Sequence, residues 1–438
     1  MKVNLLWRGL RRMRPPAPIP FFQSLVNRYG DIAHYRLGTR HVLFLNSPEY
    51  IREVLIVQHA NFIKERTQQR AQLLLGRGMI TAEGASHRKQ RQVAQPAFHR
   101  QQIPAYAAEI VRRAAHVREQ WQPNAQLDIY REMMQLTLDL VARTLFSTEL
   151  GDEVNRLNVA MGDIMKVYNA LVLLPGVNLL LGIPFTPLRK FVHARARLDR
   201  VVQRMIALHR KGLERGLQSP DLLTMMLQSQ DSMGWSDVEM RDQVITIFLA
   251  GYETVAIALT WTWYLLSQHP EVEERLYAEV REVVGDRLPA YDDLPRLKYA
   301  EMVLAESMRL YPPAWAMGRL ALNDFELGPY RLPAGTTVLM SQFITHRDAR
   351  FFPDPMRFDP ERFTPEAKAV RPRFTYFPFG MGPRQCIGEA FAWMEATLVI
   401  ATILQKWRMR HVEGHQVEPQ PLFTLRPKGG MPMDVIPR

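Results

Sequence analysis

The longest apolar segment of the chain restricts its fold more than any other feature. It covers Asp242–Gln268 and reads "DQVITIFLAGYETVAIALTWTWYLLSQ". Ser236 and Glu239 have capping-box spacing and Pro270 ends the segment, so we predict one helix of about 45 Å. Its apolar length would suit a membrane span, but Glu253 stands near its centre. A carboxylate in mid-bilayer costs about 2.5–3.5 kcal/mol. We therefore predict a helix buried through the middle of a large globular protein.

The rest of the chain is predicted to be mainly helical, with short strands. Apolar residues recur with a helical period in Ile103–Gln120, Leu127–Leu145, Val154–Leu173 and Phe191–Arg215. Two strands and a helix capped at Ser47 are expected in Gly30–Leu55, and further strands in Phe325–Arg331, Thr336–Met340 and Leu422–Val435. Internal repeats and low-complexity linkers are absent from the sequence, so we expect one domain over residues 1–438.

Composition limits the compartment and the partners. A single cysteine excludes an intrachain disulfide and favours a reducing compartment, the cytoplasm. The formal net charge of +12 favours acidic partners. Neither zinc-finger spacing nor an RNA-binding aromatic motif is present, so no nucleic-acid partner is expected. The apolar piece Val3–Trp7 is too short for a secretory signal, and we expect no cleaved signal or anchor.

The single cysteine, Cys386, has an unusual setting. It lies in "FGMGPRQCIG", Phe379–Gly388, at the N-terminal end of a predicted helix that starts directly after it and has Gly388 one residue inside. Gly380 and Gly382 allow a sharp turn whose N–H groups stabilise a thiolate and tune a bound metal. The positive end of the helix acts in the same direction, and Gly388 leaves room for a flat group. We interpret Cys386 as a metal ligand, and a single axial thiolate is one way to hold iron porphyrin. An inert buried cysteine is the alternative.

Four motifs together resemble those of the cytochrome P450 family. The decapeptide matches its F-x-x-G-x-R-x-C-x-G ligand loop. "AGYET" matches A-G-x-[DE]-T, "ESMRL" matches E-x-x-R and "PERF" matches the meander signature, at Ala250–Thr254, Glu306–Leu310 and Pro360–Phe363. A looser match covers "GASHRKQRQVAQPAF", Gly84–Phe98. The resemblance implies a mainly α fold, the triangular, α-rich haem domain of this family, with a small β-sheet region.

The resemblance also implies a haem b cofactor with Cys386 as the iron ligand. His87, Arg91, Arg319 and Arg384 fall where the family places partners of the haem propionates, although His87 replaces a frequent Trp. Phe379, Gly251 and Gly388 belong to the implied haem-binding set.

Further roles follow from the other motifs. Thr254 and Glu253 would relay protons to bound dioxygen, whereas the alternative for Thr254 is a hydroxyl bonded to the Ala250 carbonyl. Glycine at position 251 weakens the helix by up to about 1 kcal/mol relative to Ala, which fits a helix that opens beside a ligand. Glu306, Arg309 and Arg362 would form a buried structural network beneath the cysteine loop.

An apolar substrate pocket is expected. Its implied lining residues are Leu74, Leu75, Phe248, Leu249, Ala250, Ala314, Trp315 and Phe423. The segment Ala170–Leu188 carries no charge in 19 residues, and we interpret it as an apolar entrance or a membrane-touching patch. Folding inward as core is the alternative.

These implications describe a monomeric monooxygenase for a lipophilic substrate, either a fatty acid or a terpenoid. We expect no appended electron-transfer domain after Cys386, so electrons from NAD(P)H would arrive through an acidic ferredoxin or flavodoxin with its reductase. Arg88, Lys89 and Arg100 would offer that partner a basic face. The location would be cytoplasmic, with or without peripheral membrane contact. A haem-thiolate peroxygenase or isomerase and a haem-based sensor are the alternatives.

Overall fold

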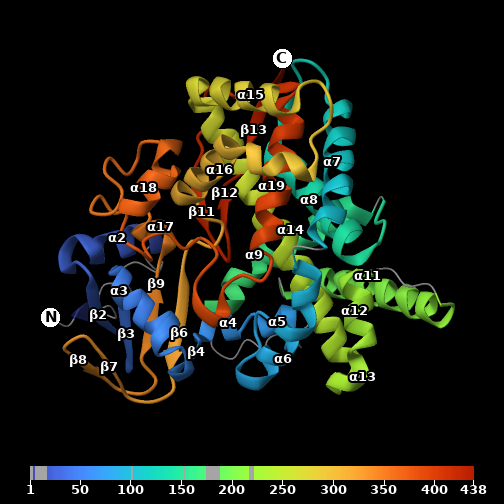
Figure 1. Cartoon of the computed structure of the whole chain (residues 1–438). Helices are drawn as coiled ribbons and strands as arrows, with labels where there is room; N and C mark the ends of the chain where they lie inside the picture. The colour runs from blue at the N-terminus through green and yellow to red at the C-terminus, as the bar shows by residue number, and fades with distance from the viewer. Residues whose placement is uncertain (1–2, 5–16, 100–101, 152, 174–187, 217–220) are drawn as a thin grey trace. The chain divides into compact units, whose positions relative to one another are not determined.

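A computed structural model describes residues 3–4, 17–99, 102–151, 153–173, 188–216 and 221–438 (Figure 1). Its contacts divide the chain into two compact units, each made from two stretches. The sheet unit consists of Met1–Gln69 and Ala305–Cys386, and the helical unit of Arg70–Leu304 and Ile387–Arg438. The single-domain expectation stays a prediction.

Helix α14 (Asp237–Gln268) is the central element of the helical unit. Ser236 and Glu239 form the predicted capping box, and the helix ends at His269, before Pro270. Most of its side chains are buried, including those of Trp261 and Trp263. Among the described helices only this one is long and apolar enough to cross a membrane, yet 83% of its apolar window is buried within the protein. The predicted buried helix is therefore confirmed.

The other elements of the helical unit surround α14 (Figure 1). Its helices are α5 (Gln72–Leu75), α6 (Gly84–Ala94), η3 (Gln95–Phe98), α7 (Ile103–Gln120), α8 (Ile129–Phe146), α9 (Glu153–Leu173), α11 (Leu188–Glu214), α12 (Leu222–Gln228), α13 (Gln230–Met233), α15 (Pro270–Val284), η4 (Tyr291–Arg296) and α19 (Glu389–Leu404). One sheet has the strand order β10 (Trp407–His411), β13 (Pro432–Pro437), β5 (Gln126–Asp128), and a hairpin joins β11 (Pro419–Pro421) to β12 (Leu425–Pro427).

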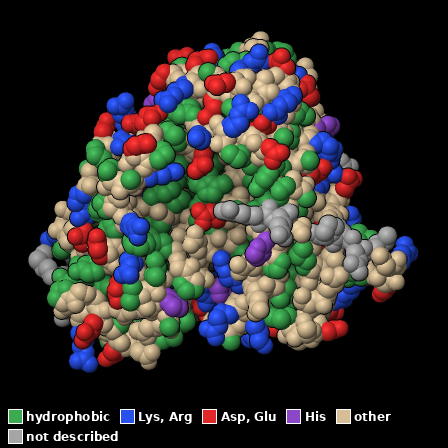
Figure 2. Space-filling model, in the orientation of Figure 1, with side chains coloured by type: hydrophobic (Ala, Val, Ile, Leu, Met, Phe, Trp, Pro, Cys, Tyr) green, Lys and Arg blue, Asp and Glu red, His purple; other side chains and the backbone are tan. Residues whose placement is uncertain are grey.

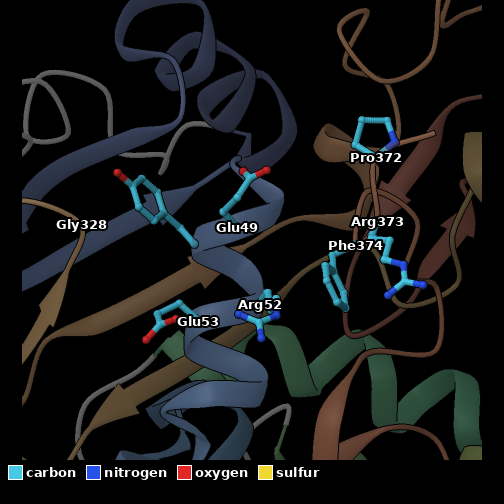
Figure 3. A pocket seen from close by; sticks show the side chains of 8 residues that line it. Glu49, Arg52, Glu53, Gly328, Pro372, Arg373 and Phe374 are labelled. Atoms are coloured by element: carbon cyan, nitrogen blue, oxygen red, sulfur yellow. The ribbon is translucent and has the colours of Figure 1, made fainter. Parts of the chain in front are cut away.

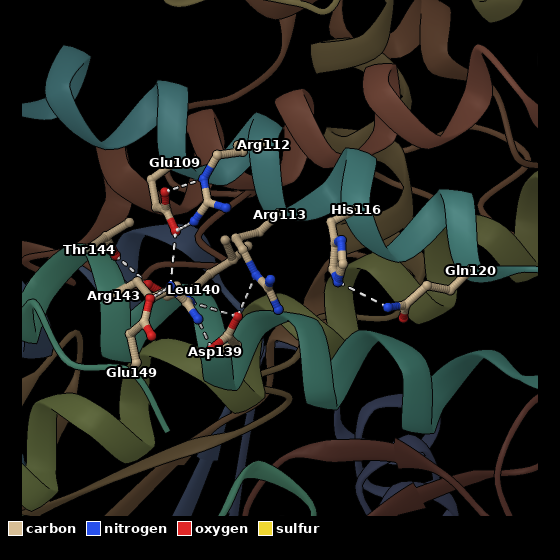
Figure 4. Close-up of polar contacts among 10 residues, drawn as sticks. All are labelled: Glu109, Arg112, Arg113, His116, Gln120, Asp139, Leu140, Arg143, Thr144 and Glu149. Carbon is tan, nitrogen blue, oxygen red and sulfur yellow. Dashed lines mark hydrogen bonds and ion pairs between the residues drawn. The ribbon is translucent and has the colours of Figure 1, made fainter. Parts of the chain in front are cut away.

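Ion pairs join helices α7 and α8 of this unit (Figure 4). Asp139 of α8 lies 2.6 Å from the Arg113 Nε of α7 and 3.0 Å from the Arg143 Nε of its own helix. Arg143 Nη1 also lies 2.5 Å from the exposed Glu149 carboxylate and 3.7 Å from Glu109. Because Asp139 is nearly buried between two guanidinium groups, its charge is neutralised where water cannot solvate it.

The sheet unit is built on a six-stranded sheet with the order β1-β2-β3-β9-β6-β4. The strands are β1 (Val3–Asn4), β2 (Ile32–Leu37), β3 (Arg40–Leu45), β4 (Phe62–Lys64), β6 (Met317–Ala321) and β9 (Thr337–Met340). β3 and β9 pair in parallel with Val42 opposite Thr337, although almost the whole helical unit separates them in sequence. Leu43, Leu45, Val338 and Met340 place apolar side chains in the core beside this sheet.

Helices and short strands complete the sheet unit. They are α2 (Pro18–Tyr29), α3 (Pro48–Arg52), η1 (Glu53–Val57), η2 (His59–Asn61), α4 (Arg66–Gln69), β7 (Phe325–Leu327), β8 (Tyr330–Leu332), α17 (Gln342–Thr345), η5 (Pro360–Phe363), α18 (Pro365–Val370) and η6 (Gly382–Arg384). Helix α16 (Lys298–Leu310) runs across the division between the units.

Most long elements match the sequence-based expectations. Helix α7 begins and ends at the predicted residues, and α8, α9 and α11 differ from theirs by a few. The predicted strand Phe325–Arg331 is instead a hairpin of two strands, because Gly328 turns the chain with a φ of +56°. Strand β6 was missed, since its residues, "MGRLA", show no alternating pattern of apolar and polar side chains.

Candidate active site

The loop that carries Cys386 is fixed by two glycines in the left-handed region. Gly380 has a φ of +72° and Gly382 a φ of +69°. A Cβ atom on Gly382 would lie 2.3 Å from the Leu55 carbonyl oxygen, so only glycine fits there. The Cys386 N–H donates to the Phe379 carbonyl at 2.9 Å and closes the loop. The loop thus presents an exposed cysteine on a rigid backbone.

The helix after this loop begins slightly later than expected. Gly388 is the N-cap of α19, which starts at Glu389, so Gly388 stands at the end of the helix and not inside it. A Cβ atom on Gly388 would lie 3.6 Å from the Phe98 ring, an ordinary contact distance. One exposed sulfur on a glycine-shaped loop suits a cofactor that needs a single protein ligand. Within the described parts of the chain, no group of three or more His, Cys, Asp or Glu residues suits a bare metal ion.

A buried ion pair lies in the sheet unit. The Arg309 guanidinium donates from Nε to Glu306 Oε2 at 2.6 Å and from Nη2 to Oε1 at 2.8 Å. Both side chains are 0% exposed. Arg362 Nε lies 3.5 Å from Glu306 Oε1, and the Asp359 N–H donates to that oxygen at 2.9 Å. The structure therefore brings the three predicted members of the network together.

His346 connects this network to the cysteine loop and was missed in the sequence. Arg309 Nη1 donates to the His346 carbonyl at 2.9 Å, and His346 Nε2 accepts the Phe377 N–H at 3.0 Å. The Phe377 carbonyl in turn accepts from the Gly380 N–H at 3.0 Å. Burial, with Arg309 and Arg347 nearby, holds the pKa of His346 well below its usual value, so the ring is neutral and accepts. A histidine inside "THRD" gave no periodic or spacing signal.

Of the four cationic residues expected near the haem propionates, two belong to the helical unit and two to the sheet unit. His87 and Arg91 are four residues apart on α6 and so share one face of that helix, where His87 is buried and Arg91 is half-buried. Arg319 lies on strand β6 and Arg384 in η6, both in the sheet unit. The roles of all four stay predictions.

The acid and alcohol of "AGYET" stand in the middle of an unbroken helix. The Thr254 hydroxyl donates to the Ala250 carbonyl at 2.8 Å, the local bond considered as its alternative role. Helix α14 does not open at Gly251. A Cβ atom there would lie 3.1 Å from the Val141 side chain, so close packing of α8 is a second reason for this glycine, and the expected opening beside a ligand stays a prediction.

Glu253 has partners that the sequence did not reveal. It is 3% exposed, and its Oε1 accepts from Arg426 Nη2 at 2.6 Å and from Arg426 Nε at 2.9 Å. The Thr424 hydroxyl donates to the same oxygen. Burial opposes the charge of Arg426, but Glu253 outweighs it and the pKa of Arg426 is raised. The only signal in the sequence was an arginine between the apolar residues of "LFTLRP".

An apolar cavity of about 90 Å³ lies against this acid–alcohol pair in the helical unit. Glu253, Thr254 and Thr424 contribute the polar part of its wall. Its other lining residues are Ala71, Leu74, Leu75, Ile80, Leu249, Ala250 and Phe423. Five of the eight predicted pocket residues therefore meet here. Phe248 packs instead against Phe146 and Tyr252, and Ala314 and Trp315 belong to the sheet unit.

Two other cavities are lined by charged residues. A 390 Å³ pocket of the sheet unit lies among Glu49, Arg52, Glu53, Arg373 and Phe374 (Figure 3). A 550 Å³ pocket of the helical unit has Arg241 paired with Asp199 and Asp242 in its wall. Because their linings hold several charges, neither suits a hydrocarbon as well as the cavity beside Thr254 does.

The comparison with known proteins agrees with the motifs. The family model for cytochrome P450 matches residues 3–432. The chain therefore belongs to the cytochrome P450 family, which implies a haem and chemistry that depends on dioxygen. Its fold is that mainly α family fold with small sheets.

Several curated relatives are bacterial oxygenases. Cyclooctatin synthase of Streptomyces melanosporofaciens is 38% identical over 93% of this chain and 89% of its own length. Cyclooctat-9-en-7-ol 5-monooxygenase of the same species is 37% identical over 91% and 86%. Pentalenene oxygenase of Streptomyces avermitilis is 34% identical over 97% and 92%. The chain is accordingly a cytochrome P450 monooxygenase.

Two sets of predicted residues cannot be placed. The side chains of the uncharged segment Ala170–Leu188 lie outside the described residues, and so does Arg100. The expected entrance or membrane patch and the full basic face therefore stay predictions.

Proposed function

We propose that this monooxygenase hydroxylates a neutral terpenoid, with Cys386 as the iron ligand and Glu253 and Thr254 as the proton relay. The observation that carries the substrate class is the cavity beside Thr254, whose wall is apolar except for the acid and two threonines. Among the described residues of that wall the one ionisable group is Glu253, which is already paired with Arg426, so the wall offers no cation to hold the carboxylate of a fatty acid. This favours a terpenoid over a fatty acid, as do the relatives that are terpenoid oxygenases.

Haem, when bound, supplies the activation of dioxygen, so that one oxygen atom enters the substrate and the other leaves as water with two electrons and two protons. The loop at Cys386 supplies the thiolate, which its closed backbone holds in one position. Thr254 presents a hydroxyl at the cavity wall, and Glu253 lies beside it as the source of protons. The apolar residues around them exclude water, which limits loss of protons and electrons to side reactions.

We further propose that electrons from NAD(P)H arrive through an acidic ferredoxin and its reductase. The support is the net charge of +12 and the exposed Arg88 and Lys89 on α6. A flavodoxin is the second candidate, because it offers the same acidic surface. A cytoplasmic location and a monomeric state remain predictions.

A binding panel tests the substrate class. Haem-loaded protein is titrated with sesquiterpene hydrocarbons such as β-caryophyllene, with lauric and palmitic acids, and with small charged compounds, while the haem spin state is followed. We expect the terpenes to shift the spectrum at the lowest concentrations. A lower half-saturation concentration for the fatty acids would transfer the proposal to that class. Preference for the charged compounds would remove the apolar-pocket argument altogether.

A further inference from the structure

The C-terminal hairpin of the helical unit is attached to the central helix at two points. Trp261 Nε1 of α14 donates to the Leu425 carbonyl at 2.8 Å. Eight residues earlier on α14, Glu253 holds Arg426, the residue after Leu425. Both contacts lie along one side of the helix. The position of the hairpin and the position of the Glu253 carboxylate are therefore linked.

All donors to Glu253 converge on one of its two oxygens. Oε1 accepts two hydrogen bonds from Arg426 and one from the Thr424 hydroxyl. No hydrogen bond to Oε2 occurs within the described part of the chain. Two charge-assisted bonds from a guanidinium fix the orientation of the carboxylate. A carboxylate held in this way cannot turn toward Thr254, so this contact must open before Glu253 can pass on protons.

The hairpin that holds Glu253 is also the wall of the substrate cavity. Phe423 and Thr424, at the turn of the hairpin, line the cavity together with Glu253. Its volume is about 90 Å³. Sites for small organic ligands usually measure roughly 300–1,000 Å³. A terpenoid seated against Thr254 would therefore press on this wall, and the wall carries Thr424, one of the groups that hold the acid.

We propose that Arg426 and Thr424 form a clamp on Glu253 that substrate opens by displacing the hairpin. Arg426 is a positioning residue here, because it acts through Glu253. With the clamp closed, the carboxylate is held against the hairpin. With the clamp open, Glu253 takes a proton from bulk solvent and gives it to the Thr254 hydroxyl, which at the same time releases its own proton into the cavity. Glu253 is then a carboxylate and Thr254 a neutral alcohol again, so no net proton is gained or lost by the protein. This inference rests on the proposed role of Glu253 as a proton source.

The matched control is a second ion pair at the base of the same hairpin. Lys428 Nζ lies 2.7 Å from Glu418, with both side chains more than half exposed. The test compares Arg426→Gln, Arg426→Lys, Thr424→Val and Lys428→Gln with the wild type, all haem-loaded, with and without β-caryophyllene. The first readout is infrared difference spectroscopy of the carboxyl C=O stretch, with Glu253→Gln identifying the band of this residue.

In the wild type we expect the Glu253 band of a protonated carboxyl to appear when the terpene binds. In Arg426→Gln the band should be present without terpene, and Arg426→Lys should restore most of the wild-type response. The second readout is peroxide release without substrate, which should rise about 5–10-fold in Arg426→Gln and remain unchanged in Lys428→Gln. A wild-type band that does not respond to the terpene, or an Arg426→Gln variant that behaves like Lys428→Gln, would overturn the clamp.

The variants also separate this inference from the proposed function. If Glu253→Gln keeps full coupling of electrons to product, the proton role of Glu253 fails, and the clamp fails with it. If Glu253→Gln uncouples the enzyme while Arg426→Gln matches the control, only the clamp is wrong. Should Arg426→Gln fold poorly, Thr424→Val keeps the cation and removes one donor. Thr424→Val should then give a smaller change of the same sign in both readouts. If this variant leaves both readouts unchanged, that result contradicts the clamp.

Discussion

At the scale of single residues, the least replaceable side chain is that of Cys386. We expect Cys386→Ala to lose the red-shifted Soret band that a thiolate-ligated haem gives when reduced and exposed to carbon monoxide. The fold should persist, because the loop is closed by backbone N–H groups that alanine retains and the side chain is exposed. Exposed substitutions usually change stability by about 0.5 kcal/mol or less. The control is Gln385→Ala in the same loop, and a red-shifted band that survives in Cys386→Ala would disprove the ligand assignment.

Thr254 has two candidate roles that a second threonine of the same helix separates. Thr262 donates to the Ala258 carbonyl at 2.8 Å, the same local bond that Thr254 makes to Ala250. Thr254→Ala should divert about half or more of the electron flux to hydrogen peroxide, since the proton path loses its hydroxyl. Thr262→Ala should not, although it loses the same helical bond. Product and peroxide are measured per NAD(P)H consumed, and equal diversion in both variants would reduce Thr254 to a helical side chain.

Sequence reasoning located motif residues well and their partners poorly. The spacing of Glu306 and Arg309 was enough to predict an ion pair, because both lie on one helical turn. Arg426 could not be assigned to Glu253, since 172 intervening residues separate 253 from 426 and no period connects a hairpin with a helix. His346 was missed for the same reason: its role depends on where the Arg309 side chain and the Phe377 backbone meet.

At the scale of elements, the Glu306–Arg309 pair holds α16 to the meander around Pro355 and Arg357, whose carbonyls accept from Arg309. Removing one partner of a fully buried pair costs about 3–5 kcal/mol, because the other charge is left without compensation. Arg309→Ala should therefore yield little haem-loaded protein and a strongly reduced melting temperature. The exposed Arg373→Ala of the same unit is the control, and a melting temperature equal to that control would contradict the prediction.

Helices α11 and α12 are joined by an ion pair between a histidine and a carboxylate. His209 Nε2 lies 3.1 Å from Asp221, whose other oxygen caps α12 by accepting the Thr224 N–H at 2.8 Å. Burial alone would lower the pKa of His209, but the hydrogen bond and charge of Asp221 outweigh it and raise the pKa above 6.5. Burial would likewise raise the pKa of Asp221, yet the bonds from His209 and Thr224 lower it below 3.8.

The sign of the pH effect follows from these directions. Because the folded-state pKa of His209 is raised, its contribution is complete below about pH 6.5 and is lost as the pH rises through the folded pKa. We expect the free energy of unfolding to fall over that interval by about 1.5–3 kcal/mol, the usual contribution of a hydrogen bond to a charged group. Denaturant titrations of wild type and His209→Gln check this. An equal pH slope in both proteins would show that His209 does not contribute.

Periodicity predicted helices such as α7 because they expose one face and bury another, as α7 does between Ile103 and Gln120. It could not predict β4, β5 or β6, whose three to five residues are strands only because a distant partner supplies the hydrogen bonds. The family motifs predicted the site residues, whereas the composition predicted only the net charge of the chain and the absence of an intrachain disulfide.

At the scale of the whole molecule, charge governs the encounter with the electron donor. Figure 2 shows Lys and Arg interspersed with Asp and Glu over the face in view, so the net charge of +12 does not form one continuous field there. A local basic pair such as Arg88 and Lys89 then matters more than the total. The rate of reduction by an acidic ferredoxin should fall about tenfold or more as salt rises from low to high concentration.

A pair of charge reversals tests the location of this encounter. Arg88→Glu/Lys89→Glu on α6 and Arg189→Glu/Lys190→Glu on α11 both reverse two adjacent, exposed cations, so they change the net charge equally. Only the first should slow reduction and flatten its salt dependence. Equal effects of the two double variants, measured by stopped-flow absorbance, would show that the total charge and not the α6 pair steers the donor.

The parallel pairing of β3 with β9 has a consequence for synthesis of the chain. Val42 leaves the ribosome 295 residues before its partner Thr337, since 337 minus 42 is 295. At about 5–20 residues per second, the first half of the sheet waits roughly 15–60 s for the strand that covers its edge. During that time the apolar strand "RHVLFL" stays an open template for other strands. Expression at lower temperature or with a holdase chaperone should therefore raise the yield of soluble protein more than any change to the haem supply.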